Sequence, residues 1–184
     1  MLLRMEEHRA ALEGTLIRLR KPEPADADML NDLFNDPAVG EHLGPVMPQP
    51  VSGFREFIES ADKNPKTAVF TIERLADRVP VGGCSFFDIE TSQRSAVLGI
   101  WLAKPYWNQG LGTDAVRTLC RFAFDHMNLQ RVALNVFATN PRGLRVYEKV
   151  GFKLEGSLRR DEFVNGELVD SYKMGLLTEE FVRE

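Results

Sequence analysis

The sequence predicts a mixed α+β fold within the broad α/β class, with helices packed on one mixed sheet. The apolar patterns follow the order strand, helix, helix, three strands, helix, strand, helix, two strands, which is not a regular βαβ repeat. Asn165-Gly166 separates the last two strand patterns and is typical of a two-residue hairpin turn. The 184 residues contain no repeat or linker, so a single domain over 1–184 is expected, with 1–14 as an N-terminal extension.

The first half of the chain supplies one strand, two helices and three further strands. The segment 35–50 between the helices holds four prolines and two glycines and is expected to be a loop. Ala68, Phe70 and Ile72 alternate inward in one strand, and Gly82-Gly83 in the next indicates a bulge or a close approach of two backbones. The expected elements are the strand 15–20, the helices 26–34 and 54–61, and the strands 67–73, 79–89 and 95–103.

The second half alternates helices and strands before a final hairpin. Apolar residues from Leu111 to His126 share one face at helical spacing, which predicts an amphipathic helix. The expected elements are the helix 111–126, the strand 131–137, the helix 142–150 and the strands 152–164 and 168–177.

The composition is typical of a globular protein and narrows the possible partners. Hydrophobic residues make up 43% and charged residues 27%, and the net charge of −4 argues against a nucleic-acid binder. No apolar stretch is long enough for a signal peptide or a membrane span, so no membrane partner and a cytoplasmic location are expected. Cys84 and Cys120 lack paired spacing and the histidines lack metal-ligand spacing, so we expect neither disulfide nor metal.

A glycine-containing loop, Trp107-Asn108-Gln109-Gly110-Leu111-Gly112-Thr113, joins a predicted strand to a predicted helix. Two glycines at a helix N-terminus let backbone N–H groups close on a phosphate, and the helix dipole favours negative charge there. The pattern also fits a dinucleotide fingerprint, but about six residues separate strand from glycine and the next strand lacks the acidic residue for a ribose. A P-loop is excluded because no Gly-Lys-Ser/Thr follows.

A second motif, Asn140 to Phe152, lies one helix and one strand further along. Together the two motifs resemble those of the GNAT superfamily of N-acetyltransferases, and Glu155 to Asp170 is similar to the tail of its ribosomal-protein (RimJ/RimL-like) branch. The resemblance implies a central mixed, mostly antiparallel sheet of six to seven strands with about four helices. It also implies that acetyl passes from acetyl-CoA to a primary amine by direct attack in a ternary complex.

The resemblance further implies a set of cofactor-binding residues. Backbone groups of Trp101, Leu102 and Ala103 would pair with the pantetheine arm as an added strand would. Asn140 would bond to pantetheine or cap the helix that follows, and Arg145 is the arginine best placed for a phosphate. The amides expected to hold the pyrophosphate are those of Gln109, Gly110, Leu111, Gly112 and Thr113.

The resemblance makes Tyr147 the expected catalytic acid. A phenol with an ordinary pKa of about 10 is protonated at neutral pH and can donate to the departing thiolate. The identity of the general base stays open, because Val97 stands where family members often carry glutamate. Asp88 and Glu90 on the preceding strand are the candidates that the sequence favours, acting through water.

The acceptor site is expected to involve Glu41, His42 and Phe54, and Glu41 or His42 could also accept a proton. The acceptor itself stays open between a protein N-terminus, a polyamine, an amino sugar and an amino acid. The alternative function is a non-catalytic acyl-CoA-binding or sensing module on the same fold. The absence of a glutamate at position 97, where Val97 stands, favours this alternative, and the presence of Tyr147 disfavours it. A homodimer is the default expectation for self-association.

Overall fold

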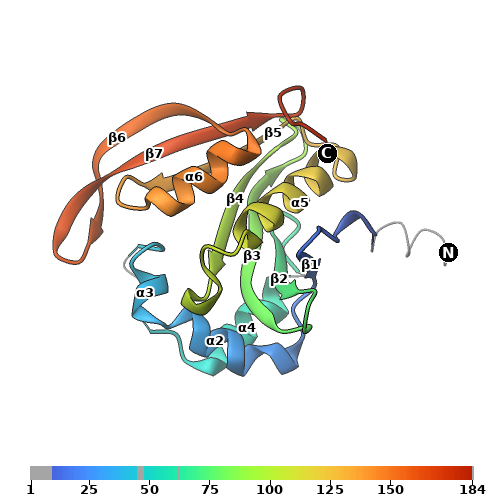
Figure 1. Cartoon of the computed structure of the whole chain (residues 1–184), viewed down its shortest axis with the longest axis vertical. Helices are drawn as coiled ribbons and strands as arrows, with labels where there is room; N and C mark the ends of the chain where they lie inside the picture. Colours follow the sequence, from blue (N-terminus) through green and yellow to red (C-terminus); the bar gives the residue numbers. More distant parts are fainter. Residues whose placement is uncertain (1–9, 45–47, 62, 184) are drawn as a thin grey trace.

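The computed structural model describes residues 10–44, 48–61 and 63–183, and its central feature is one twisted sheet (Figure 1). Its seven strands lie in the order β1-β2-β3-β4-β5-β7-β6. Only β4 and β5 pair in parallel, so the sheet is mostly antiparallel, as expected. The strands are β1 (Ile17–Arg20), β2 (Ala68–Arg74), β3 (Pro80–Glu90), β4 (Ser95–Leu102), β5 (Arg131–Phe137), β6 (Lys153–Val164) and β7 (Glu167–Leu177).

Helices cover both faces of the sheet. The longest, α5 (Leu111–Asp125), packs beside α6 (Pro141–Val150) and contributes its apolar stripe to the main core. On the other face, α2 (Ala27–Phe34) and α4 (Val51–Ala61) form a smaller core with the indole of Trp101. These four helices match the expected number, and each lies within a few residues of its predicted position.

The segment 35–50 is not wholly a loop, which corrects the prediction. It contains a short helix, α3 (Pro37–Gly40), whose N-cap Asp36 accepts a hydrogen bond from the Ala38 N–H at 2.9 Å. A capping aspartate followed by proline at the first helical position is a known helix start, so the Asp36-Pro37 pair carried the missed signal.

Two glycine-containing predictions are confirmed by the backbone. Asn165 and Gly166 have φ of 50° and 87°, the positive values that a type I′ turn requires, and they join β6 to β7. Gly82 lies so close to β4 that an added Cβ would stand 2.2 Å from the Trp101 carbonyl oxygen. A close backbone approach therefore explains this glycine.

The start of β1 is fixed by a carboxylate in the first turn of α5. Asp114 accepts hydrogen bonds from the backbone N–H groups of Thr15, Leu16 and Ile17 at 3.2, 2.7 and 3.0 Å. Of the predicted N-terminal extension, residues 1–9 lie outside the described part of the chain. Residues 10–14 pack on α5, where Arg121 donates to the carbonyl oxygens of Ala11 and Glu13.

Candidate active site

A cleft of about 560 Å³ opens where the two parallel strands separate. β4 and β5 pair only as far as Val97 and Ala133. Beyond that point the two strands no longer pair, and both line the cleft. The lining residues are Ile100, Trp101 and Leu102 from β4 and Asn135, Val136 and Phe137 from β5. The volume lies in the range of small-molecule sites, roughly 300–1,000 Å³.

The backbone of β4 offers this cleft an open strand edge. Because Ala103 N–H donates to the Val81 carbonyl oxygen at 2.9 Å, Gly82 and Leu102 form a non-hydrogen-bonded pair between β3 and β4. Leu102, and Ile100 two residues earlier, therefore direct their N–H and C=O groups away from β3 and towards the gap. An extended chain of amides could pair there as a strand does.

The three residues predicted to make strand contacts are placed differently from one another. Ala103 is buried outside the cleft lining, and its N–H and C=O already bond to Val81 and Tyr106. The backbone groups of Trp101 face β3, while its indole packs edge-on to Phe34 in the smaller core, with ring centroids 5.3 Å apart. Of the three predicted residues, Leu102 directs its backbone N–H to the cleft, while its carbonyl oxygen accepts a hydrogen bond from the Trp107 indole.

At one end of the cleft, the N-terminus of α5 is shaped to bind an anion. The first amide bonded within the helix is that of Asp114, which donates to the Gly110 carbonyl oxygen. The amides of Leu111, Gly112 and Thr113 precede it and have no backbone partner among the described residues. Gly110 has φ of +82°, and an added Cβ at Gly112 would stand 3.3 Å from Leu102 Cδ1, so both glycines keep this approach open.

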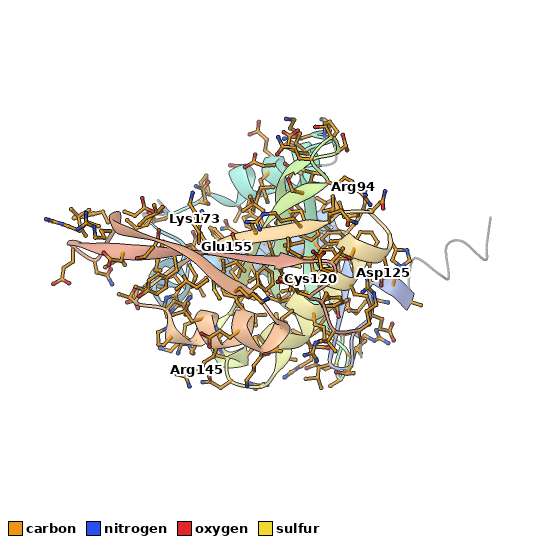
Figure 2. All side chains as sticks on the ribbon, turned by 90° about the horizontal axis from the view of Figure 1, so that it is seen from above. Arg94, Cys120, Asp125, Arg145, Glu155 and Lys173 are labelled. Carbon is orange, nitrogen blue, oxygen red and sulfur yellow. The ribbon has the colours of Figure 1, made fainter. Side chains whose placement is uncertain are left out.

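Cationic side chains border the same end. Arg145 and Lys149 on α6 line the cleft, and Figure 2 shows Arg145 at the outer surface of that helix. Together with the free amides of α5 they fit the phosphates of coenzyme A. The side chain of Gln109 bonds to the Pro105 carbonyl oxygen, and neither Gln109 nor Leu111 lines the cleft with its side chain.

One wall of the cleft contains a row of contacting side chains, in which Arg142 lies against both Trp107 and His42. The Arg142 guanidinium stacks on the Trp107 ring, 3.8 Å from its centroid, and Arg142 Nη2 lies 3.0 Å from His42 Nε2. The Trp107 indole N–H donates to the Leu102 carbonyl oxygen at 2.7 Å, which anchors this row to β4. Burial and the neighbouring guanidinium lower the pKa of His42, so its imidazole is neutral near pH 7.

The α6 N-terminus brings Asn140 and Tyr147 into the cleft. Asn140 caps the helix by accepting a hydrogen bond from the Gly143 N–H at 2.9 Å, and it also lines the cleft, so it combines both predicted positions. Tyr147 lines the cleft, with its ring packed edge-on against Phe152. Burial raises the pKa of its phenol to about 12.

The cleft also carries a carboxylate that the sequence did not single out. Glu162 on β6 lines the cleft with Phe137 and His42. Gly44 lies close to both Phe137 and Glu162. A Cβ added to it would be 3.6 Å from the Phe137 ring and 3.9 Å from Glu162 Oε2. No ion pair of Glu162 occurs among the described residues.

Several predicted residues lie elsewhere. Asp88 and Glu90 stand at the end of β3 beside the paired part of β4, and Glu90 forms an ion pair with Lys66. Phe54 is buried in the smaller core and is not in the cleft. Glu41 lines a neighbouring second cavity. The structure therefore gives no support to Asp88 or Glu90 as the base or to Phe54 as an acceptor contact.

Neither cysteine lines the cleft. Cys84 and Cys120 are buried, Cys120 well inside the molecule in Figure 2, and burial raises both thiol pKa values far above their usual range. The described residues contain no cluster of three or more histidine, cysteine, aspartate or glutamate side chains that could hold a metal ion. Nor does any described helix have the length and apolarity to span a membrane.

Comparison with known proteins places this site in a family. A model of the acetyltransferase (GNAT) domain matches residues 17–153. YdaF of Bacillus subtilis (strain 168), named as a candidate ribosomal N-acetyltransferase, is 31% identical over 173 residues, which cover 91% of this chain and 94% of YdaF. The spermidine N(1)-acetyltransferase of Escherichia coli (strain K12) is 25% identical over 171 residues, covering 91% of this chain and 89% of that protein.

Solved structures show the same architecture. Spermidine N-acetyltransferase from Vibrio cholerae, crystallised with CoA and spermine, has a TM-score of 0.85 at 22% identity and covers 92% of this chain and 99% of its own. RimJ of Mycobacterium smegmatis with CoA-disulfide has a TM-score of 0.81 at 22% identity, covering 91% and 85%. At this identity the likeness concerns the fold.

The fold and the cleft define a coenzyme A-dependent acyltransferase, since a helix N-terminus suited to phosphates adjoins a strand edge open to an amide-bearing arm. The family match covers more than half of the chain. The chain belongs to the GNAT acetyltransferase family and is an acetyl-CoA-dependent N-acetyltransferase.

Proposed function

We propose that the protein acetylates a small cationic primary amine that enters at the Glu162 end of the cleft. The observation that carries this proposal is the distribution of charge in one cleft. The amides at the start of α5 and the side chains of Arg142, Arg145 and Lys149 supply positive charge, and Glu162 is the one carboxylate among the described lining residues. Such an arrangement favours the anionic cofactor beside the amides and cations and an ammonium beside the carboxylate.

In this proposal the cleft residues divide the chemistry between them. The backbone of Leu102 and the α5 N-terminus hold the thioester against the strand edge, so that attack occurs within one complex. Glu162 accepts a proton from the ammonium, directly or through water, and the freed amine nitrogen bonds to the acetyl carbon. The carbon–sulfur bond breaks, and the Tyr147 hydroxyl donates its proton to the departing thiolate. The acylated nitrogen then loses its remaining extra proton, which restores the Tyr147 hydroxyl, and the proton on Glu162 passes to solvent.

The test is turnover with a panel of acceptors. Purified protein is incubated with acetyl-CoA and spermidine, an amino sugar, an amino acid or a peptide with a free N-terminus, and release of the CoA thiol is followed. We expect the cationic polyamine to give the highest kcat/KM. Binding of acetyl-CoA without release of thiol on any amine would support the non-catalytic alternative instead.

The peptide arm of this panel tests a second candidate function. The 31% identity with YdaF favours a protein N-terminal amine, in keeping with the RimJ/RimL-like branch predicted from the sequence.

We include self-association as a prediction that the same preparation can test by light scattering. A spermidine N-acetyltransferase from Vibrio cholerae, 23% identical, is dodecameric.

The role of Glu162 predicts a defect confined to proton acceptance. Glu162→Gln should lower kcat/KM for the amine by about 100-fold, the lower range of general-base effects, with the KM for acetyl-CoA unchanged. Glu167→Gln, an exposed site beyond the hairpin turn, is the matched control. If both variants keep wild-type rates, Glu162 is not the base.

A hydrogen-bonded clamp should position the acceptor end of the cleft. Asn35 Oδ1 accepts from the Gln49 N–H and Asn35 Nδ2 donates to the Gln49 carbonyl oxygen, both at 2.9 Å, which joins the ends of the segment that carries His42. Asn35→Ala should raise the KM for the amine several-fold and leave the KM for acetyl-CoA unchanged. Asn64→Ala, which removes a turn contact to the Lys66 N–H, is the control. A parallel rise in both KM values would contradict this role.

A further inference from the structure

A second cavity of about 440 Å³ lies between α3 and the tip of the β6–β7 hairpin, which bends towards α3 in Figure 1. It adjoins the Glu162 end of the cleft. Gly44 lines the second cavity, yet a Cβ on it would contact Phe137 and Glu162, which both line the cleft. Gly44 therefore lies where the two spaces adjoin, next to residues of both.

The second cavity has apolar walls and a negative rim. Its walls include Phe34 from the end of α2 and Phe163 from β6, and Phe163 is 56% exposed despite its size. The ring therefore offers the cavity apolar surface from which an alkyl chain would exclude water. Glu41 lies in the lining, and none of the described lining residues is a lysine or an arginine.

Glu41 is the carboxylate of this cavity that remains available to bind a cationic ligand. The other acidic residue of the lining, Asp36, already caps α3 through the Ala38 N–H. Glu41 forms no ion pair among the described residues, and its side chain is exposed. It follows α3 directly, and the contacts of that helix hold its backbone.

We propose that the second cavity is a subsite for the remote end of the acceptor and takes an alkyl chain that ends in a second cation. The chain would lie against Phe163, and its terminal ammonium would pair with Glu41. This inference rests on the proposed function, because it requires the reacting amine to be at Glu162. It adds that the acceptor carries a second charge at a set distance from the first.

The chain itself limits that distance. Glu41 and Gly44 are three residues apart, so their Cα atoms are separated by at most about 11 Å. Since Glu162 Oε2 lies beside Gly44, the two carboxylates are within reach of one flexible linear molecule. Short diamines should place only one ammonium, whereas longer ones should place both.

The test is a homologous series of linear α,ω-diamines, from diaminopropane to diaminodecane, each compared with the monoamine of the same length. For the wild-type protein we expect kcat/KM to rise with diamine length to an optimum and to exceed that of the matched monoamine by up to about five-fold. An exposed charge pair contributes at most about 1 kcal/mol, which corresponds to that factor. Glu41→Gln should lower kcat/KM for each long diamine to that of the matched monoamine measured with the same variant, with the KM for acetyl-CoA unchanged.

Two further variants make the result specific. Phe163→Ala should lower kcat/KM for long diamines and long monoamines alike, because it removes the apolar wall and no charge. Glu56→Gln, at an exposed position of α4 outside both spaces, should change nothing. Glu41 is exposed, so its substitution should leave folding intact, as circular dichroism would verify.

The outcomes separate the two proposals. Equal rates for diamines and monoamines, or a Glu41→Gln variant with wild-type preference, would overturn the subsite while acetylation of amines stands. A peptide N-terminus that is acetylated better than any diamine, with no effect of Glu41→Gln, would also overturn it. Acetyl-CoA binding without acetylation of any amine would refute the proposed function, and the subsite with it.

Discussion

Replacing Tyr147 with phenylalanine is expected to lower kcat by about 100- to 1,000-fold, within the range of general acid catalysis, while the KM for acetyl-CoA stays nearly unchanged. The phenol is the donor that we assign to the departing thiolate. Phenylalanine keeps the ring and its edge-on contact with Phe152, so the substitution removes the hydroxyl and little packing. The loss should therefore appear in the chemical step.

Burial of the phenol adds a pH signature. Because burial raises the pKa of Tyr147 to about 12, the acid stays protonated through the whole usable pH range. The wild-type rate should not fall at alkaline pH through loss of this proton, whereas a phenol at its ordinary pKa of about 10 would cause such a fall. A pH–rate profile from neutral to about pH 10.5 distinguishes the two cases.

The matched control is Tyr172→Phe on β7, outside the cleft lining. It removes a phenol of the same kind and should keep the wild-type rate. If Tyr147→Phe behaves like Tyr172→Phe, another group protonates the thiolate. A fall in rate accompanied by a lower melting temperature in Tyr147→Phe would instead indicate a structural role.

The cofactor half of the site is largely predictable because its signals are local. The glycines after β4 and the asparagine before α6 sit at helix N-termini, and each acts within a few residues of its own motif. Strand register is a different matter. Whether Trp101 or Leu102 faces the cleft depends on the bond from Ala103 to Val81, and that bond joins two strands. Periodicity in one strand cannot reveal which edge is free.

The acceptor half could not be predicted, and Glu162 shows why. It follows two arginines and an aspartate, a run typical of a solvated strand. Between Leu158 and Glu162 the register with β7 shifts, so that four residues of β6 advance against two of β7, and Arg160 takes φ of 52°. Such a bulge breaks the alternation of faces, so the direction of Glu162 cannot be counted along the strand.

Removing the Asp114 carboxylate is expected to have the largest effect on stability, because it is the only acceptor seen for three successive backbone N–H groups at the start of β1 in the described chain. Asp114→Ala should lower the free energy of unfolding by about 2–4 kcal/mol, since hydrogen bonds to a charged group contribute roughly 1.5–3 kcal/mol each and these are partly exposed. The loss also removes a negative charge from the positive end of the α5 dipole. For a domain of this size the melting temperature should fall by about 5–15 °C.

Thermal and urea unfolding of Asp114→Ala, Asp114→Asn and Asp32→Ala would test this. Asp32 is an exposed residue of α2, so its variant should unfold as the wild type does. Asp114→Asn should be intermediate, because one amide oxygen can still accept while the charge is lost. Gly14→Ala should reproduce the defect from the other side, since its Cβ would stand 2.4 Å from Asp114 Oδ2 and force the carboxylate away. Equal stability of Asp114→Ala and Asp32→Ala would mean that water replaces the carboxylate and that core packing alone fixes β1 against α5.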